Sequence, residues 1–312
     1  MSLRNGGLGR VLCALDIEHE EWGPLAISSV MAEYFHVPLD ALYAARSGAW
    51  EDRTERVRRL IAEHSARERL DQLIAPLATT IAVTASVQRG AAGDVILQQA
   101  SESHAGLIVL GSADRRSFGS GSHRLAMTIA STATAAVLTV PSDARACAVQ
   151  RILVLITSAT AARPALKWAT ALAGRFGASV SLARMAPPAS WFGAGLFGPT
   201  RRSQDATRRR ATLVERSLDR LREADIAVSE EPEQLDATGL ARLAAEGAFD
   251  LVVVGLPAAL DPGAEEIALV ERLRQCSLVP VLSVRARVRR SSQALWAGSP
   301  QPRGSGTIEY AA

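Results

Sequence analysis

Short runs of consecutive apolar residues alternate along the chain with longer stretches whose apolar residues repeat at helical spacing. Unbroken runs of Val, Ile and Leu are typical of strands that are buried on both faces of a parallel sheet. In the first half of the chain the predicted strands are residues 10–16, 37–45, 80–88, 106–111 and 136–140. The predicted helices between them are residues 24–35, 50–75, 92–103 and 124–133. This alternation predicts an open α/β sheet with right-handed crossovers.

The second half of the chain repeats the same order of elements. Its predicted strands are residues 151–156, 178–185, 226–230, 249–254 and 280–284, and its predicted helices are 162–176, 204–223, 236–246 and 265–275. The ends of the first, fourth and fifth apolar runs recur after 141, 144 and 144 residues. Such regular spacing indicates a tandem duplication. We therefore predict two Rossmann-like domains, each with a five-stranded parallel sheet flanked by helices, at 8–141 and 150–285, followed by a disordered basic tail at 286–312.

The helix predicted at 50–75 is long and rich in charged residues. We assign four of its apolar residues to its apolar face: Val57, Leu60, Ile61 and Leu70.

Composition narrows the class of protein. Hydrophobic residues make up 48% of the chain and charged residues 21%, which is ordinary for a globular protein with a core. The formal charge of +3 is too small to predict binding to nucleic acid. The three cysteines have no metal-ligand spacing, and no apolar run approaches the ~18 residues of a membrane span. We therefore expect a cytoplasmic protein with reduced thiols and no membrane partner.

In an open α/β sheet, ligands bind beyond the carboxyl ends of the strands, where the strand order reverses. Asp16 ends the first predicted strand, and the segment GSADRRSFGSGSHR follows the fourth. Its glycines allow a close backbone approach, its serines and arginines donate hydrogen bonds, and the next helix offers a positive N-terminus, so it suits a phosphate. The alternative is that the segment is only a flexible loop and that Asp16 caps the next helix.

The order and spacing of the predicted strands and helices, over roughly residues 8–284, resemble those of the universal stress protein family in its tandem form. The most specific resemblance lies in the second half, where RILVLITSATAARPALKWATALAGRFGASVSLARM is similar to the family's first strand, helix and second strand. FDLVVVG and VPVLSV are similar to its fourth and fifth strands. The first half resembles the family through VLCALD, QRGAAGDVILQQAS and AGLIVLGS.

Nucleotide-binding members of the family hold ATP with an aspartate after the first strand and a G-2x-G-9x-G-(S/T) loop. By position, Asp16 matches the aspartate and Gly111 the first glycine, whereas Asp114 stands at the second glycine. The closing pair best matches Gly121–Ser122, at a shorter spacing than the motif has, and counting back from the last strand places it at His123–Arg124.

The resemblance implies that domain 1 binds ATP or AMP, with or without magnesium. The candidate binding residues are Ala14, Leu15, Asp16, Ala44, Leu110, Gly111, Asp114, Arg115, Ser120, Gly121, Ser122 and His123.

The second domain lacks these features. Thr157 replaces the aspartate, and the loop after Gly255 carries the acidic residues Asp261, Glu265 and Glu266, which would repel a phosphate. We expect this domain to bind no nucleotide and to act as a scaffold or regulator. The family commonly pairs its domains through the last strand, so residues 136–140 and 280–284 are expected to form an intramolecular pseudo-dimer; a homodimer is a further option.

The expected function is therefore that of a non-catalytic stress-response protein that binds an adenine nucleotide. No P-loop lysine, nucleophile elbow or Cys–His arrangement appears, and the cluster around His19 reads as a solvated loop rather than a metal site. One alternative is a nucleotide-free interaction or regulatory protein in which both loops have decayed. A weaker one is a slow ATP hydrolase, an activity known in parts of the family. The aromatic segment 187–202 either docks a partner or packs across its own sheet.

Overall fold

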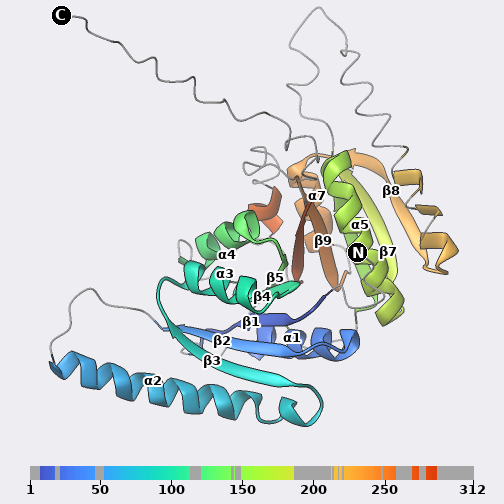
Figure 1. Ribbon diagram of the computed structural model, residues 1–312. Coiled ribbons are helices and arrows are strands. Elements are labelled where there is room, and N and C mark those ends of the chain that lie inside the picture. The colour runs from blue at the N-terminus through green and yellow to red at the C-terminus, as the bar shows by residue number, and fades with distance from the viewer. Residues whose placement is uncertain are drawn as a thin grey trace, which may run out of the picture.

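The structure is a computed structural model of the 312-residue chain, shown in Figure 1. It describes residues 8–17, 22–45, 53–112, 121–141, 144, 149–185, 212, 214–216, 218–219, 221–246, 249–257, 269–273 and 279–286. The predicted basic tail, apart from residue 286, and the aromatic segment 187–202 lie outside these residues.

Ten strands form one continuous sheet in the order β3-β2-β1-β4-β5-β10-β9-β6-β7-β8. The strands are β1 Val11–Ala14, β2 Leu39–Ala45, β3 Val83–Arg89, β4 Leu107–Ser112, β5 Ala136–Pro141, β6 Arg151–Ile156, β7 Ser179–Met185, β8 Val228–Leu235, β9 Leu251–Leu256 and β10 Val281–Arg285. The helices are α1 Trp22–Phe35, α2 Arg53–Ile74, α3 Ala92–Glu102, α4 Gly121–Thr132, α5 Ala159–Phe176 and α7 Ala237–Glu246, with a short 3-10 helix at Leu77–Thr79. Residues 269–273 are also helical.

The predicted fold class is confirmed. We call the half that contains β1 to β5 copy one and the half that contains β6 to β10 copy two. Each copy has five parallel strands, with its first strand at the centre and its fourth and fifth on the side that faces the other copy. The two halves therefore repeat one topology, as the spacing of the apolar runs predicts.

Helices cover both faces of this sheet, and each face has its own core. On one face, α1, α2, α5 and the helical residues Val214, Leu218 and Leu221 pack in a single cluster that runs from Leu8 to Val284. On the other face the core is divided: α3 and α4 cover copy one, whereas α7 and the helical residues 269–273 cover copy two, with Met127 of α4 packed against them. Among the described residues, one continuous apolar core therefore joins the two copies on the first face, which we call the α1/α2/α5 face.

The two copies meet at an antiparallel pair of strands. β5 pairs with β10, with Leu138 opposite Leu282, and both side chains are buried. This confirms the predicted pairing of the last strands. Two ring contacts join α1 to α5 next to this seam: Phe35 lies edge-on to Trp168 with centroids 6.4 Å apart, and Tyr34 lies 4.4 Å from Phe176.

Local sequence features fix where several elements begin. The Ser158 hydroxyl accepts a hydrogen bond from the Ala161 amide and caps α5, which ends at Gly177 in the left-handed conformation that favours glycine. In copy one, the Arg10 guanidinium lies 2.6 Å from the buried Asp40 carboxylate and neutralises it. These contacts hold the amino ends of β1 and β2 and the start of α5.

The prediction for the long helix was wrong in one respect. Leu70 is fully buried, but Val57, Leu60 and Ile61 are 52%, 55% and 62% exposed. Figure 1 shows α2 extending past the end of the sheet. The end of β3 at Arg89 lies beside Glu63, and α2 runs back toward the start of β3, so the residues before Glu63 project beyond the strands. At 3.6 residues per turn, Val57 and Ile61 also lie on the side of the helix away from the buried Leu70, so they face solvent.

The continuous core predicts that the two copies are energetically coupled through Phe35 and Trp168. In a double-mutant cycle of Phe35→Leu and Trp168→Leu, the coupling in the free energy of unfolding should be about 0.5–1.5 kcal/mol, because ring pairs in contact have values of this size. Urea unfolding measures it. The control combines Trp168→Leu with Ile96→Val, which lies in the separate core of copy one and should add within roughly 0.5 kcal/mol. A Phe35–Trp168 coupling no larger than this control would mean that the ring contact does not join the copies.

Candidate functional site

The strand order of copy one reverses at β1. β1 pairs with β2 on one side and with β4 on the other, and the helices that follow β1 and β2 cover the opposite face from α3 and α4. A crevice at the carboxyl ends of β1 and β4 is the usual ligand site of such a sheet. The predicted site residues that follow β1 and β4 are therefore at the edge where ligand chemistry is expected.

Asp16 stands at this edge, two residues beyond the end of β1. The Leu15 amide still donates a hydrogen bond to the Leu42 carbonyl, 2.9 Å away, so the chain follows β2 up to that point and then leaves the sheet. Asp16 is half-buried. β4 ends nearby with Gly111 and Ser112, which are also half-buried and pair with the end of β5. The Asp16 carboxylate and the Gly111–Ser112 end of β4 are thus both found where the strand order of copy one reverses.

The structure divides the remaining predicted residues into three groups. Ala14, Ala44 and Leu110 belong to the core that α3 and α4 cover, with Leu110 almost fully buried. Gly121, Ser122 and His123 form the first turn of α4, so the N-terminus of this helix begins at the predicted loop. Asp114, Arg115 and Ser120 lie outside the described residues.

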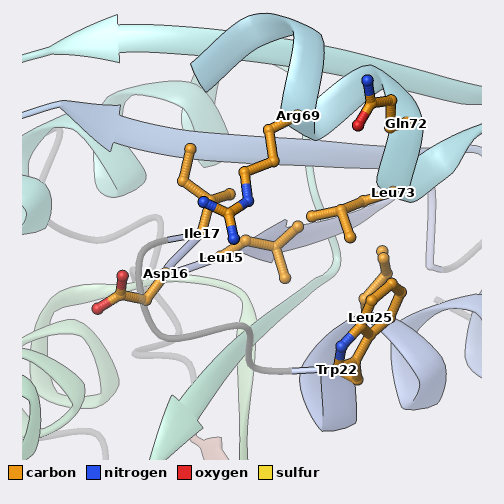
Figure 2. Close-up of a pocket in the computed structure, with 8 residues that line it drawn as sticks. All are labelled: Leu15, Asp16, Ile17, Trp22, Leu25, Arg69, Gln72 and Leu73. Carbon is orange, nitrogen blue, oxygen red and sulfur yellow. The ribbon is translucent and has the colours of Figure 1, made fainter. Parts of the chain in front are cut away.

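Leu15 points to the other face of the sheet, where a pocket of about 250 Å³ opens between α1 and α2. Figure 2 shows the pocket, whose lining residues are Leu15, Asp16, Ile17, Trp22, Leu25, Arg69, Gln72 and Leu73. The helical residues of this lining were not predicted from the sequence. The spacing of Arg69, Gln72 and Leu73 could have indicated a shared surface, because it places all three on one face of α2.

The same edge of copy two is closed. Thr157, which replaces the aspartate, is 1% exposed, and its hydroxyl donates a hydrogen bond to the Gly255 carbonyl 3.0 Å away. α5 starts at Ala159, immediately afterwards, and packs so tightly on β9 that a Cβ on Gly255 would lie 2.1 Å from the Ala161 carbonyl oxygen. Gly255 matches the first glycine of the family loop, but here it has a packing role. The hydroxyl and the helix together fill the strand-order reversal of copy two.

The end of β10 carries polar groups that are buried. The Ser283 hydroxyl and the Nε and Nη2 atoms of Arg285 have no hydrogen-bond partner in the part of the chain that the structure describes. Burial lowers the pKa of the Arg285 guanidinium. Both residues lie beside the seam, on the face that α7 and residues 269–273 cover.

The described residues contain neither a candidate membrane-spanning helix nor a candidate metal site. None of the helices described is long and apolar enough to span a bilayer. Within the same residues, no three or more His, Cys, Asp or Glu side chains gather in a way that could hold a metal ion. The cluster around His19 lies outside them.

The reversal of strand order, the helices on both faces and the exposed carboxyl edge of copy one define the class of open, doubly wound α/β proteins. Residues 148–299 match the sequence model of the Universal stress protein family. This match extends over the second half of the chain, where the sequence resemblance is also most specific. No curated protein matches the sequence.

Solved structures with the same fold cover nearly the whole chain. A universal stress protein from Archaeoglobus fulgidus DSM 4304 is 13% identical, with a TM-score of 0.64, and the alignment covers 89% of this chain and 97% of that one. A protein of unknown function from Pseudomonas aeruginosa PAO1 is 14% identical, with a TM-score of 0.56, over 91% of this chain and 95% of that one. At this identity the similarity is one of fold, and it extends over both copies.

The closed edge of copy two predicts the result of restoring its aspartate. Thr157→Asp should destabilise the protein by about 2–4 kcal/mol, because the new carboxyl group would be buried beside a carbonyl oxygen. Burial raises the pKa of a carboxyl group, so the loss should be larger at about pH 8 than at about pH 5. Thermal and urea unfolding at both pH values measure it.

Thr157→Ser keeps the hydroxyl and is the matched control. It should remain close to the wild type in stability at both pH values. A Thr157→Asp protein as stable as Thr157→Ser would show that this edge is open.

Proposed function

We propose that the chain is a tandem universal stress protein that binds ATP or AMP at the carboxyl edge of copy one, with copy two as a scaffold. The observation that carries this proposal is the contrast between two equivalent positions. Asp16 is half-buried at a strand end that leaves the sheet, whereas Thr157 is sealed under α5. Of the two residues that stand at these equivalent positions, Asp16 carries a carboxylate and Thr157 does not.

Asp16 suits the nucleoside part of the ligand. Its carboxylate accepts hydrogen bonds, and an adenine amine and a ribose hydroxyl are both donors. In Figure 2 the carboxylate is directed away from Leu73 and Trp22, toward the side of the sheet that carries α3 and α4. Ala14, Ala44 and Leu110 belong to that same side, as a nucleoside bound there requires.

The phosphates suit the end of β4 and the start of α4. Gly111 and Ser112 end the strand, and α4 begins at Gly121 with backbone amides that have no partner within the helix. The positive end of the helix dipole favours an anion at this point. Asp114 departs from the family motif, and Arg115 or a magnesium ion carried by the nucleotide would offset its charge.

We propose a regulatory rather than a catalytic role, in the stress response and in the cytoplasm. The support is the lack of a P-loop lysine or a nucleophile elbow anywhere in the sequence, so any phosphate is held by backbone amides, hydroxyls and arginines. Copy two supports copy one through the shared core of the α1/α2/α5 face. Slow ATP hydrolysis is the weaker alternative, and measurement of phosphate release above background tests it.

A second candidate function is that of a nucleotide-free interaction protein. The observation in its favour is the projecting part of α2, where Val57, Leu60 and Ile61 are more than half exposed. Apolar side chains gathered on a surface are typical of protein contact sites. Mass spectrometry of small molecules released from the purified protein separates the two candidates: a released adenine nucleotide supports the first. No released nucleotide, together with no thermal shift in millimolar ATP, supports the second.

We predict that Asp16→Ala weakens ATP binding about tenfold to a hundredfold, since a hydrogen bond to a charged group contributes roughly 1.5–3 kcal/mol. Isothermal titration calorimetry with ATP and with AMP measures the change. The control is Asp219→Ala, which removes an exposed aspartate from copy two and should leave the affinity as it is. Equal affinities in the wild type and in Asp16→Ala would remove Asp16 from the site.

A further inference from the structure

The pocket between α1 and α2 is separate from the proposed nucleotide site. Leu15 and Ile17 line it and belong to the core of the α1/α2/α5 face. Ala14 and Leu110, by contrast, belong to the α3/α4 side. The end of β1 therefore carries two surfaces on opposite faces of the sheet, and Asp16 lies at the boundary between them.

The floor of the pocket is apolar and rigid. Leu15, Ile17 and Leu25 are 8%, 5% and 4% exposed, and each is held in the core. Trp22, in the first turn of α1, is 58% exposed and forms one wall opposite Leu73 (Figure 2). A tryptophan ring that stands this far in solvent beside an apolar floor offers a flat face on which another ring can stack.

The rim of the pocket on α2 is polar and positively charged. Arg69 and Gln72 both line it, and Figure 2 shows the Arg69 guanidinium reaching over Leu15 toward the end of β1. Both residues are exposed, so a ligand can reach their donors from solvent. The one carboxylate in the lining, Asp16, is directed away from Trp22 and Leu73. The rim on α2 thus places one cationic group and one amide beside the apolar floor.

We propose that this pocket binds a small aromatic carboxylate, with its ring on Trp22 and its carboxylate on Arg69 and Gln72. A volume of about 250 Å³ is below the usual range of drug-sized sites, which suits a ligand of one or two rings. A guanidinium matches a carboxylate with two parallel hydrogen bonds, and an amide adds a further donor. A few polar groups above an apolar floor are what such small-molecule sites generally have.

The test is a titration with 1-naphthoate as the probe, by calorimetry on the full-length chain without nucleotide. The wild type should bind the probe, and Arg69→Gln should weaken binding about tenfold or more because it removes the charged donor. Trp22→Ala should weaken binding to a similar extent, whereas Trp22→Phe should stay within about threefold of the wild type because it keeps a stacking face. The uncharged analogue 1-naphthamide should bind about tenfold more weakly than 1-naphthoate to the wild type and equally to Arg69→Gln.

Arg58→Gln is the matched control, because it removes an exposed arginine from the projecting part of the same helix. It should bind the probe as the wild type does. Thermal unfolding of each variant verifies that the fold is intact, and Trp22→Phe keeps the test valid if Trp22→Ala does not fold. The proposal is overturned if the wild type does not bind 1-naphthoate, if Arg69→Gln and Arg58→Gln bind it equally, or if the charged and uncharged probes bind alike.

Discussion

The antiparallel pairing of β5 with β10 is the contact on which the rest of the architecture depends. It joins two parallel five-stranded sheets into one sheet of ten strands and covers an edge of each that would otherwise invite association with another chain. It also makes the strands of the two copies run in opposite directions. The carboxyl edges of the copies consequently lie at opposite ends of the molecule. The described strand ends of one copy therefore lie away from the carboxyl edge of the other.

The length of the first connection in each copy decides what that edge can do. In copy two, only Thr157 and Ser158 separate β6 from α5, and α5 packs directly against Gly255. In copy one, residues 15–21 separate β1 from α1, so the helix starts farther from the strand end. The longer connection leaves Asp16 at the edge and gives room for the pocket under Trp22. One difference in loop length thus accounts for an open edge in copy one and a filled one in copy two.

Most of the fold could be predicted from the sequence because unbroken apolar runs mark parallel strands directly, and their repeated spacing marks the two copies. One error came from the assignment of the apolar residues of the long helix to a single face. Val57 and Ile61 lie on the side of α2 away from Leu70, and Leu70 is the residue that is buried. The positions of Asp16 and Gly111 at the carboxyl edge could be predicted because both residues come at the ends of strands. The pocket was missed because Trp22 and Arg69 are brought together by packing between two helices.

The exposed apolar residues of the described chain are unevenly divided between the two copies. In the described part of the chain, the large hydrophobic residues that are exposed all belong to copy one: Trp22, Tyr34, Val57, Leu60 and Ile61. Exposed apolar surface costs free energy in water and is retained where a ligand or partner covers it. The family match, however, lies over copy two, which kept the packing and closed its edge. The two halves therefore differ in a consistent way: the copy that the family model matches buries Thr157 at its strand end, whereas the other copy has the half-buried Asp16 at the equivalent position and carries the exposed apolar residues.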